Sequence, residues 1–194
     1  MQKRLFLTGP SGCGKTRMIR EALGEKLAEC GGFVTERVFG PGGALLGYDL
    51  LPAAAAAGVE GFVPLRFLDY SRDPPTRDNE VFRGEAVRLL QEAEYYPFAV
   101  LDEIGGFELV IPQFRAQLGA FLSSSVPCLG VLKAPAGVEE LRERFGLGEK
   151  YTALAEKLLM ALDADPDTLV LETSGRGDER AKQAICDWVD RFTR

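Results

Sequence analysis

Short apolar runs alternate with amphipathic stretches along most of the chain, and this alternation is typical of an α/β fold. The apolar runs have the length of strands, whereas the amphipathic stretches repeat apolar residues every three or four positions, as helices do. Strands that alternate with helices predict a mostly parallel sheet with helices on both faces, which is a three-layer sandwich. The expected strands of this sheet are residues 5–7, 31–38, 97–103, 126–134 and 168–173. The expected helices begin after residue 16, span 79–94, 112–122 and 138–162 with a break near Gly146 and Gly148, and end the chain through 192.

A second set of apolar runs follows the first helix without amphipathic stretches between its members. Gly-Pro-Gly-Gly at 40–43 predicts a hairpin loop, and the alanine run at 52–58 is long enough only for a helical turn, so we interpret it as a connection. These features predict a small antiparallel extension of the sheet, a β-rich insert at about 33–70. Its expected strands are residues 31–38, 44–51 and 59–68, and the proline-rich stretch 71–78 is expected to be a loop.

The stretch GPSGCGKT follows the first apolar run and matches the Walker A pattern of a phosphate-binding loop. Gly9, Gly12 and Gly14 lack side chains, which lets the loop turn backbone N–H groups towards phosphate oxygens. Lys15 is expected to contact the β- and γ-phosphates as a catalytic residue, and the Thr16 hydroxyl is expected to ligate Mg²⁺. The helix that follows places the phosphates at its N-terminus, where anions are stabilised. The residues predicted to bind nucleotide are Gly9, Pro10, Ser11, Gly12, Cys13, Gly14, Lys15, Thr16, Arg17 and, after the last strand, Arg176.

A pair of acids, Asp102 and Glu103, ends the apolar run PFAVLDE. Ligands of open α/β sheets collect at the carboxyl ends of the strands, so the pair is predicted to lie beside the phosphate loop. Asp102 is expected to hold Mg²⁺ as a Walker B aspartate does, while Glu103 orients and deprotonates the attacking water. Without the upstream loop, this short motif would indicate only the end of a strand.

Three basic residues beyond the acid pair are candidates for the further positive charge that phosphoryl transfer needs. Lys133 lies at the end of the expected strand at 126–134 and is predicted to be a catalytic residue that contacts the γ-phosphate. Arg142 and Arg144 lie in the helix that follows and could close over the site as a lid. For each arginine, a solvated helix face is the simpler interpretation.

Composition and charge limit the chemistry and the partners. The 194 residues carry a net charge of −6, which argues against nucleic acid as a partner. The chain has no histidine and no Cys-x-x-Cys pair, so Cys/His zinc sites and a histidine general base are excluded. No apolar run approaches a membrane span and the first is too short for a signal peptide, so we expect a cytoplasmic protein with no membrane contact. The length predicts one domain, 1–194, as a monomer or weak oligomer.

Taken together, these motifs resemble the THEP1-type nucleoside triphosphatases. The matching pieces are TGPSGCGKT, GGFVTERV, LLGYDL and LDEIGGFEL, and the resemblance spans about residues 5 to 132. It implies a RecA-like P-loop domain that hydrolyses ATP, GTP and other nucleoside triphosphates to diphosphates with Mg²⁺. The chain departs from the family pattern at Arg17, where a second hydroxyl residue is usual, and at 174–176, where the family often has an asparagine-arginine pair.

Other nucleotide-dependent functions fit parts of this pattern. Asp102, Ile104 and Gly105 satisfy the DxxG pattern of small GTPases, but the chain lacks the NKxD-like segment that selects guanine. A P-loop nucleotide or nucleoside kinase shares the loop and would use Glu103 to activate a hydroxyl, but it needs a second pocket. A nucleotide-controlled binding module is a further alternative. We expect a Mg²⁺-dependent nucleoside-triphosphate phosphohydrolase, with the kinase and the binding module as alternatives.

Overall fold

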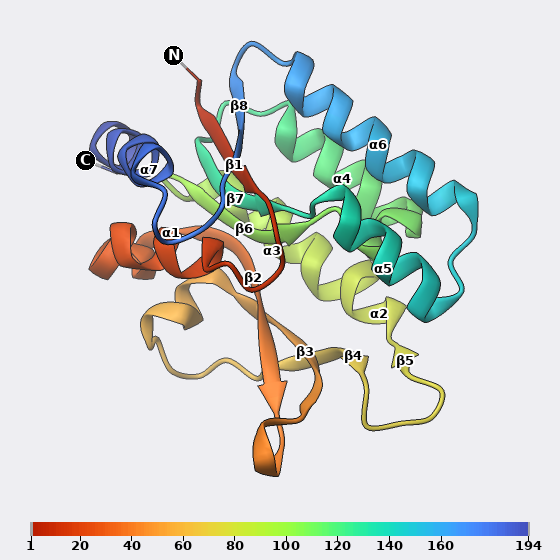
Figure 1. Ribbon diagram of the computed structural model, residues 1–194. Helices are drawn as coiled ribbons and strands as arrows, with labels where there is room; N and C mark the ends of the chain where they lie inside the picture. Colours follow the sequence, from red (N-terminus) through yellow and green to blue (C-terminus); the bar gives the residue numbers. More distant parts are fainter. Residues whose placement is uncertain (1, 194) are drawn as a thin grey trace.

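Eight strands form one mixed sheet in the computed structural model, which describes residues 2–193 (Figure 1). Met1 and Arg194, the ends of the predicted domain, lie outside the described residues. The strands are β1 (Arg4–Thr8), β2 (Gly31–Phe39), β3 (Leu45–Pro52), β4 (Leu65–Asp69), β5 (Thr76–Arg77), β6 (Ala99–Ile104), β7 (Cys128–Leu132) and β8 (Thr168–Glu172). Their order across the sheet is β5-β4-β3-β2-β6-β7-β1-β8. The strands from β2 to β8 in this order pair in parallel, whereas β3, β4 and β5 form the predicted antiparallel extension.

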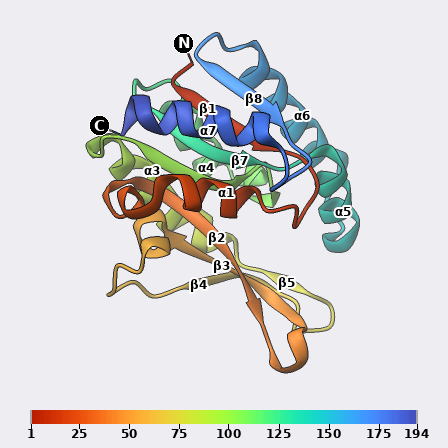
Figure 2. The same ribbon diagram turned by 60° about the vertical axis from the view of Figure 1, so that its left-hand side comes forward.

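Helices cover both faces of the sheet, as the sequence predicts (Figure 2). They are α1 (Lys15–Leu23), α2 (Asn79–Val81), α3 (Val87–Glu92), α4 (Pro112–Leu122), α5 (Pro135–Phe145), α6 (Glu149–Ala164) and α7 (Glu179–Phe192). Helices α1 and α7 lie on one face, and α3 to α6 lie on the other. Among residues 2–193, no helix combines the length and the apolar character needed to cross a membrane.

Successive residues of β1 pack into different cores, because side chains alternate across a sheet. Leu5 and Leu7 belong to the core that includes Ile19 of α1 and Trp188 of α7. Phe6 belongs to the larger core, to which α3, α4, α5 and α6 contribute. Apolar packing therefore holds β1 from both faces of the sheet, immediately before the phosphate loop begins.

The antiparallel extension differs from its prediction in where its strands begin. Strand β4 begins at Leu65 and not at residue 59. Gly61 has a left-handed φ of 97°, and Pro64 has no N–H to donate to a strand ladder, so residues 59–64 do not continue the strand. The stretch 71–78, expected to be a loop, contains the short strand β5, which pairs with β4. The alanine run forms a 3₁₀ turn at Ala53–Ala57, which agrees with its interpretation as a connection.

The predicted helices are present, with a π-helical turn within one of them and a different first residue in another. The segment expected at 79–94 is helical throughout, with a π-helical turn at Phe82–Ala86 between α2 and α3. The expected break within 138–162 lies between α5 and α6. Helix α5 ends at Phe145, and Gly146 follows it with a φ of 57°, in the left-handed region that glycine favours after a helix. Helix α5 begins earlier than expected, at Pro135, because proline suits the first turn of a helix.

Three parallel strands bring the predicted motifs to one edge of the sheet. Strand β7 lies between β1, which precedes the phosphate loop, and β6, which carries the acid pair. Val131 of β7 is paired with Leu7 on one side and with Asp102 on the other. The phosphate loop, the acid pair and Lys133 therefore meet at the carboxyl edge of these strands.

Phe114 of α4 tests how closely the larger core is packed. Its side chain is fully buried, and its ring centroid lies 5.3 Å from that of Phe82 and 6.1 Å from that of Phe33. Phe114→Ala should lower the free energy of unfolding by about 3–5 kcal/mol, because it removes buried apolar contacts and leaves a cavity. Urea denaturation measures this loss. Phe39→Ala is the control, since Phe39 is exposed, and an equal loss in the two variants would contradict the packing.

Candidate active site

The phosphate loop has the backbone conformation that its glycine spacing predicts. Gly9, Gly12 and Gly14 all have positive φ, at 141°, 77° and 101°. Two of these positions also have no room for a side chain. A Cβ on Gly9 would lie 2.2 Å from the Thr173 carbonyl oxygen, and a Cβ on Gly14 would lie 2.6 Å from Cγ of Arg176. The loop therefore needs glycine for its conformation and for its close contact with the segment after β8.

Lys15 begins α1, and its side chain reaches back over the loop. Its Nζ donates hydrogen bonds to the carbonyl oxygens of Gly9, at 2.9 Å, and Pro10, at 2.8 Å. The residue is only 7% exposed, so the ammonium group is held against the loop. The positive charge and the N-terminus of α1 attract anions to the same place. This arrangement is suited to binding phosphate groups.

Asp102 is buried at the end of β6, beside Thr16. Burial raises the pKa of Asp102 to about 6, although its hydrogen bond with Thr16 opposes the shift. A hydroxyl oxygen next to a carboxylate gives the oxygen donors that Mg²⁺ prefers, so the two predicted ligands fit the ion. Among residues 2–193, no cluster of three acidic or cysteine side chains offers a separate metal site. The remaining ligands would come from the nucleotide and water.

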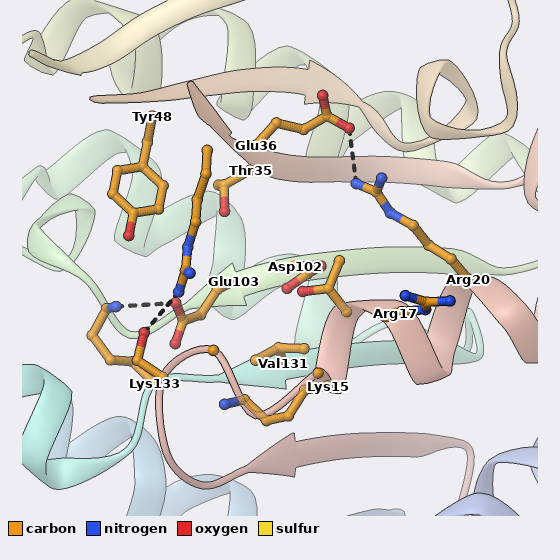
Figure 3. Close-up of a pocket in the computed structure, with 15 residues that line it drawn as sticks. Lys15, Arg17, Arg20, Thr35, Glu36, Tyr48, Asp102, Glu103, Val131 and Lys133 are labelled. Atoms are coloured by element: carbon orange, nitrogen blue, oxygen red, sulfur yellow. Dashed lines mark hydrogen bonds and ion pairs between the residues drawn. The ribbon is translucent and has the colours of Figure 1, made fainter. Parts of the chain in front are cut away.

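Glu103 and Lys133 form an ion pair at the cavity wall (Figure 3). Lys133 Nζ donates to Glu103 Oε2 at 3.0 Å. The Lys133 backbone N–H also donates to the Ile104 carbonyl oxygen at 2.8 Å, which ties the end of β7 to the acid pair. Burial disfavours the charged lysine, but the charge and hydrogen bond of Glu103 outweigh it and raise the pKa of Lys133. The ion pair therefore orients the Glu103 carboxylate beside the phosphate loop.

These groups surround one cavity of about 570 Å³, shown in Figure 3. The phosphate loop and α1 form one wall, the acid pair and Lys133 form another, and side chains of β2 and β3 complete it. The lining residues are Ser11, Gly12, Gly14, Lys15, Thr16, Arg17, Arg20, Thr35, Glu36, Arg37, Tyr48, Asp102, Glu103, Val131 and Lys133. Most of the predicted site residues therefore lie around the same space.

Several lining residues come from outside the predicted motifs. Arg37 of β2 donates from Nη2 to the Ser11 hydroxyl at 3.0 Å, so the antiparallel extension contacts the loop directly. Arg20 of α1 pairs with Glu36 of β2 at 3.0 Å. The stretch GGFVTERV contains these β2 residues, but its pattern indicates only a strand. Their place at the site depends on how the extension folds back over the loop.

The two arginines predicted to bind nucleotide, Arg17 and Arg176, lie at different places around the phosphate loop. Arg17 is exposed and pairs with Glu21 at 2.6 Å, at the opposite end of the cavity from Lys133 in Figure 3. Arg176 lies against Gly14, and its backbone N–H donates to the Cys13 carbonyl oxygen at 3.3 Å. The role of Arg17 and Arg176 in binding nucleotide stays a prediction.

The two arginines considered as a lid differ in position. Arg142 pairs with Glu139 on the same helix and does not line this cavity. Arg144 pairs with Glu140 at 3.0 Å, and its guanidinium lies 5.1 Å from the centroid of the Tyr70 ring. Of these two arginines, only Arg144 therefore stacks on an aromatic ring, that of Tyr70 at the end of the predicted β-rich insert.

Glu108 anchors the turn that follows the acid pair. Its Oε1 accepts hydrogen bonds from the N–H groups of Gly105, at 2.9 Å, and Gly106, at 2.7 Å. Tyr151 of α6 donates from its hydroxyl to the Gly105 carbonyl oxygen at 3.1 Å. Burial raises the pKa of Glu108 to about 7, although these hydrogen bonds and the charge of Lys133 oppose the shift. The turn after the acid pair is thus held by two buried side chains that the motifs do not predict.

Comparison with known proteins assigns the chain to a family. A family model described as NTPase matches residues 4–155. The cancer-related nucleoside-triphosphatase of Homo sapiens is 32% identical over 168 aligned positions, which cover 74% of this chain and 85% of that protein. The chain belongs to the THEP1-type nucleoside-triphosphatase family. The Bos taurus homologue of the human protein is also 32% identical, with the same coverage.

A solved member of the THEP1 type has the same fold. The crystal structure of THEP1 from the hyperthermophile Aquifex aeolicus matches this THEP1-type chain with a TM-score of 0.61 and 17% sequence identity. The match covers 97% of this chain and 99% of that one. It confirms the predicted α/β P-loop fold. The antiparallel extension is shown by the strand pairing of this chain.

Glu108 should make the stability of this THEP1-type chain depend on pH. Its pKa is about 7 in the folded protein, against an ordinary value of 4.5, so the folded state keeps a proton that the unfolded chain releases between those values. The stability from this group is present below about pH 4.5 and is lost as the pH rises through about 7. Glu108→Gln should flatten this dependence, as measured by urea denaturation at a series of pH values.

Glu94→Gln is the matched control, because Glu94 is exposed in a 3₁₀ turn. It should retain the pH dependence of the parent protein. A parent-like slope in Glu108→Gln would contradict the account of the buried carboxyl group.

Proposed function

We propose that this chain hydrolyses nucleoside triphosphates to the diphosphate and inorganic phosphate. The observation that carries the proposal is that the phosphate loop, the Thr16 and Asp102 side chains and the Glu103–Lys133 pair line one cavity. The names of the curated relatives, all nucleoside-triphosphatases, support the same reaction. ATP, GTP and other nucleoside triphosphates are the proposed substrates.

The phosphate loop and Lys15 are proposed to bind the triphosphate. Backbone N–H groups of the loop turn towards phosphate oxygens, and the Lys15 ammonium contacts the β- and γ-phosphates. Thr16 and Asp102 would hold Mg²⁺, which when bound neutralises charge on these phosphate oxygens. The burial of Asp102 and Lys15 supports this role, because charges act more strongly where water is excluded.

Glu103 is proposed to orient the attacking water and to take its proton. A general base works only if it lies within reach of the water, and Glu103 stands at the cavity wall, where Lys133 fixes its direction. Lys133 is proposed to contact the γ-phosphate, where its charge offsets the charge that develops as the bond to the leaving group breaks. The same lysine would then both position the base and stabilise the transition state.

The nucleoside part of the substrate is proposed to lie near Arg17 and Arg176. Both residues flank the later half of the loop, beside Gly14 and the start of α1. Their long, flexible side chains make general contacts with a base, so we propose that several bases are accepted. We also propose that the chain works as one P-loop domain, because its strands form one sheet.

Steady-state release of phosphate from ATP, GTP, CTP and UTP tests the proposed reaction. We expect release from each nucleotide in the presence of Mg²⁺ and its loss when a chelator removes the ion. Absence of release from all four nucleotides, in protein that still binds them, would contradict the proposal.

Lys15→Ala should abolish turnover and greatly weaken binding of the triphosphate. The lysine's charge contacts the loop and not the apolar cores, so the fold should remain intact. A loss of at least about 10²-fold in kcat is expected when a charge on the transferred group is no longer offset. Lys150→Ala, on the exposed face of α6, is the control. Normal hydrolysis by Lys15→Ala would refute the assignment of the loop.

Glu103→Gln should lose hydrolysis but keep affinity for the triphosphate. The amide keeps the shape of the side chain but cannot take a proton, so kcat should fall by about 10²- to 10⁴-fold. Single-turnover kinetics and equilibrium binding measure the two effects separately. A rate within about twofold of the parent would point to another base, and equal losses of binding and turnover would make Glu103 a structural or metal-binding residue.

A further inference from the structure

A second cavity, of about 480 Å³, adjoins the first at Glu103 and Lys133. Both side chains line both cavities. The antiparallel extension and the π-helical turn form one wall of the second cavity, and α5 forms the other. Its volume is within the range of pockets that bind small molecules. The proposed hydrolysis of nucleoside triphosphates gives this space no role.

The second cavity lies on the side from which the attacking oxygen would approach the γ-phosphorus. The early loop residues Gly9 and Pro10 line it, whereas Thr16 and Arg17, at the start of α1, line only the first cavity. In phosphoryl transfer, the attacking and leaving oxygens lie roughly in line across the phosphorus. A molecule in the second cavity therefore meets the γ-phosphate from the side of Glu103, away from the nucleoside that carries the triphosphate.

The walls of the second cavity are suited to a flat ring. Tyr48 of β3 and Phe67 of β4 have their ring centroids 6.2 Å apart, and Tyr70 packs edge-on against Tyr48 at 6.0 Å. Arg144, which also lines the cavity, lies over the Tyr70 ring, and the centroid of the Phe145 ring lies 5.9 Å from that of Tyr70. Aromatic and guanidinium faces of this kind bind nucleobases by stacking, with little dependence on which base is present.

Most of the charged side chains around the second cavity are paired with one another. Its acids are Glu103, Glu108 and Glu140, and its bases are Arg37, Lys133 and Arg144. Two of these bases are already paired with acids: Lys133 with Glu103, and Arg144 with Glu140. The third base, Arg37, donates to the Ser11 hydroxyl, so little positive charge in this cavity is free for a phosphate group. The cavity therefore favours an uncharged ligand with a ring.

We propose that the second cavity binds an uncharged aromatic alcohol of nucleoside size, whose hydroxyl takes the γ-phosphoryl group in place of water. The inference rests on the proposed function, since it uses the same phosphate loop and Glu103. The hydroxyl oxygen forms a bond to the γ-phosphorus while the bond from that phosphorus to the β–γ bridging oxygen breaks. Glu103 takes the hydroxyl proton and passes it to solvent. The products are a phosphate monoester and the nucleoside diphosphate.

The test uses the full chain, Mg²⁺ and ATP labelled in its γ-phosphate, with adenosine, guanosine, cytidine, uridine or thymidine as the acceptor. We expect label in a nucleoside monophosphate as well as in inorganic phosphate, with a share that rises and saturates as the nucleoside concentration increases. Normal phosphate release with no labelled ester from any nucleoside would overturn this inference and leave the proposed hydrolysis standing. Loss of both products would instead overturn the proposed hydrolysis. A parallel series offers the corresponding nucleoside 5′-monophosphates as acceptors, and transfer to these alone would overturn the choice of an uncharged acceptor.

Tyr70→Ala tests the position of the acceptor. It should lower the ratio of labelled ester to phosphate by about tenfold, because base stacking on an aromatic ring contributes about 1–3 kcal/mol. Tyr70→Phe keeps the ring and should restore the parent ratio. Tyr95→Ala, with an 88% exposed side chain, is the control. A parent ratio in Tyr70→Ala would overturn the assignment of the acceptor to this cavity.

Discussion

Parallel pairing of β7 with β1 on one side and β6 on the other is the constraint on which the site depends. This pairing fixes Val131 between Leu7 and Asp102, so the phosphate loop and the acid pair flank the end of one strand. The two apolar cores hold the three strands from both faces of the sheet. Lys15, Asp102 and Glu103 then need only local turns to reach a common cavity. The glycines supply one such turn, and the anchor made by Glu108 and Tyr151 supplies another.

The sequence predicts the parts of the site whose geometry is local. The loop conformation follows from glycine at positions 9, 12 and 14, and the acid pair follows from its place at the end of an apolar run. Lys133 was predictable as a strand end, although its pairing with Glu103 joins side chains 30 residues apart and depends on the register of β6 and β7. The break between α5 and α6 also follows from local chemistry, since glycine is favoured after a helix.

The parts that the sequence did not predict depend on contacts between distant segments. Strand β5 has two residues in a proline-rich stretch, so it has no periodicity of its own and exists through pairing with β4. Arg37 reaches Ser11 only because the antiparallel extension folds over the loop. Likewise, Arg142 and Arg144 look equivalent in the sequence. Only the packing of α5 beside the extension places Arg144 over Tyr70 and leaves Arg142 paired on its own helix.

The central claim is that water held by Glu103 attacks the γ-phosphorus of a triphosphate bound to the loop. Hydrolysis in heavy-oxygen water tests it most directly, because the position of the label identifies the phosphorus that is attacked. The account predicts one heavy oxygen in the released phosphate and none in the nucleoside diphosphate. Label in the diphosphate, with unlabelled phosphate, would show attack at another phosphorus and contradict the account.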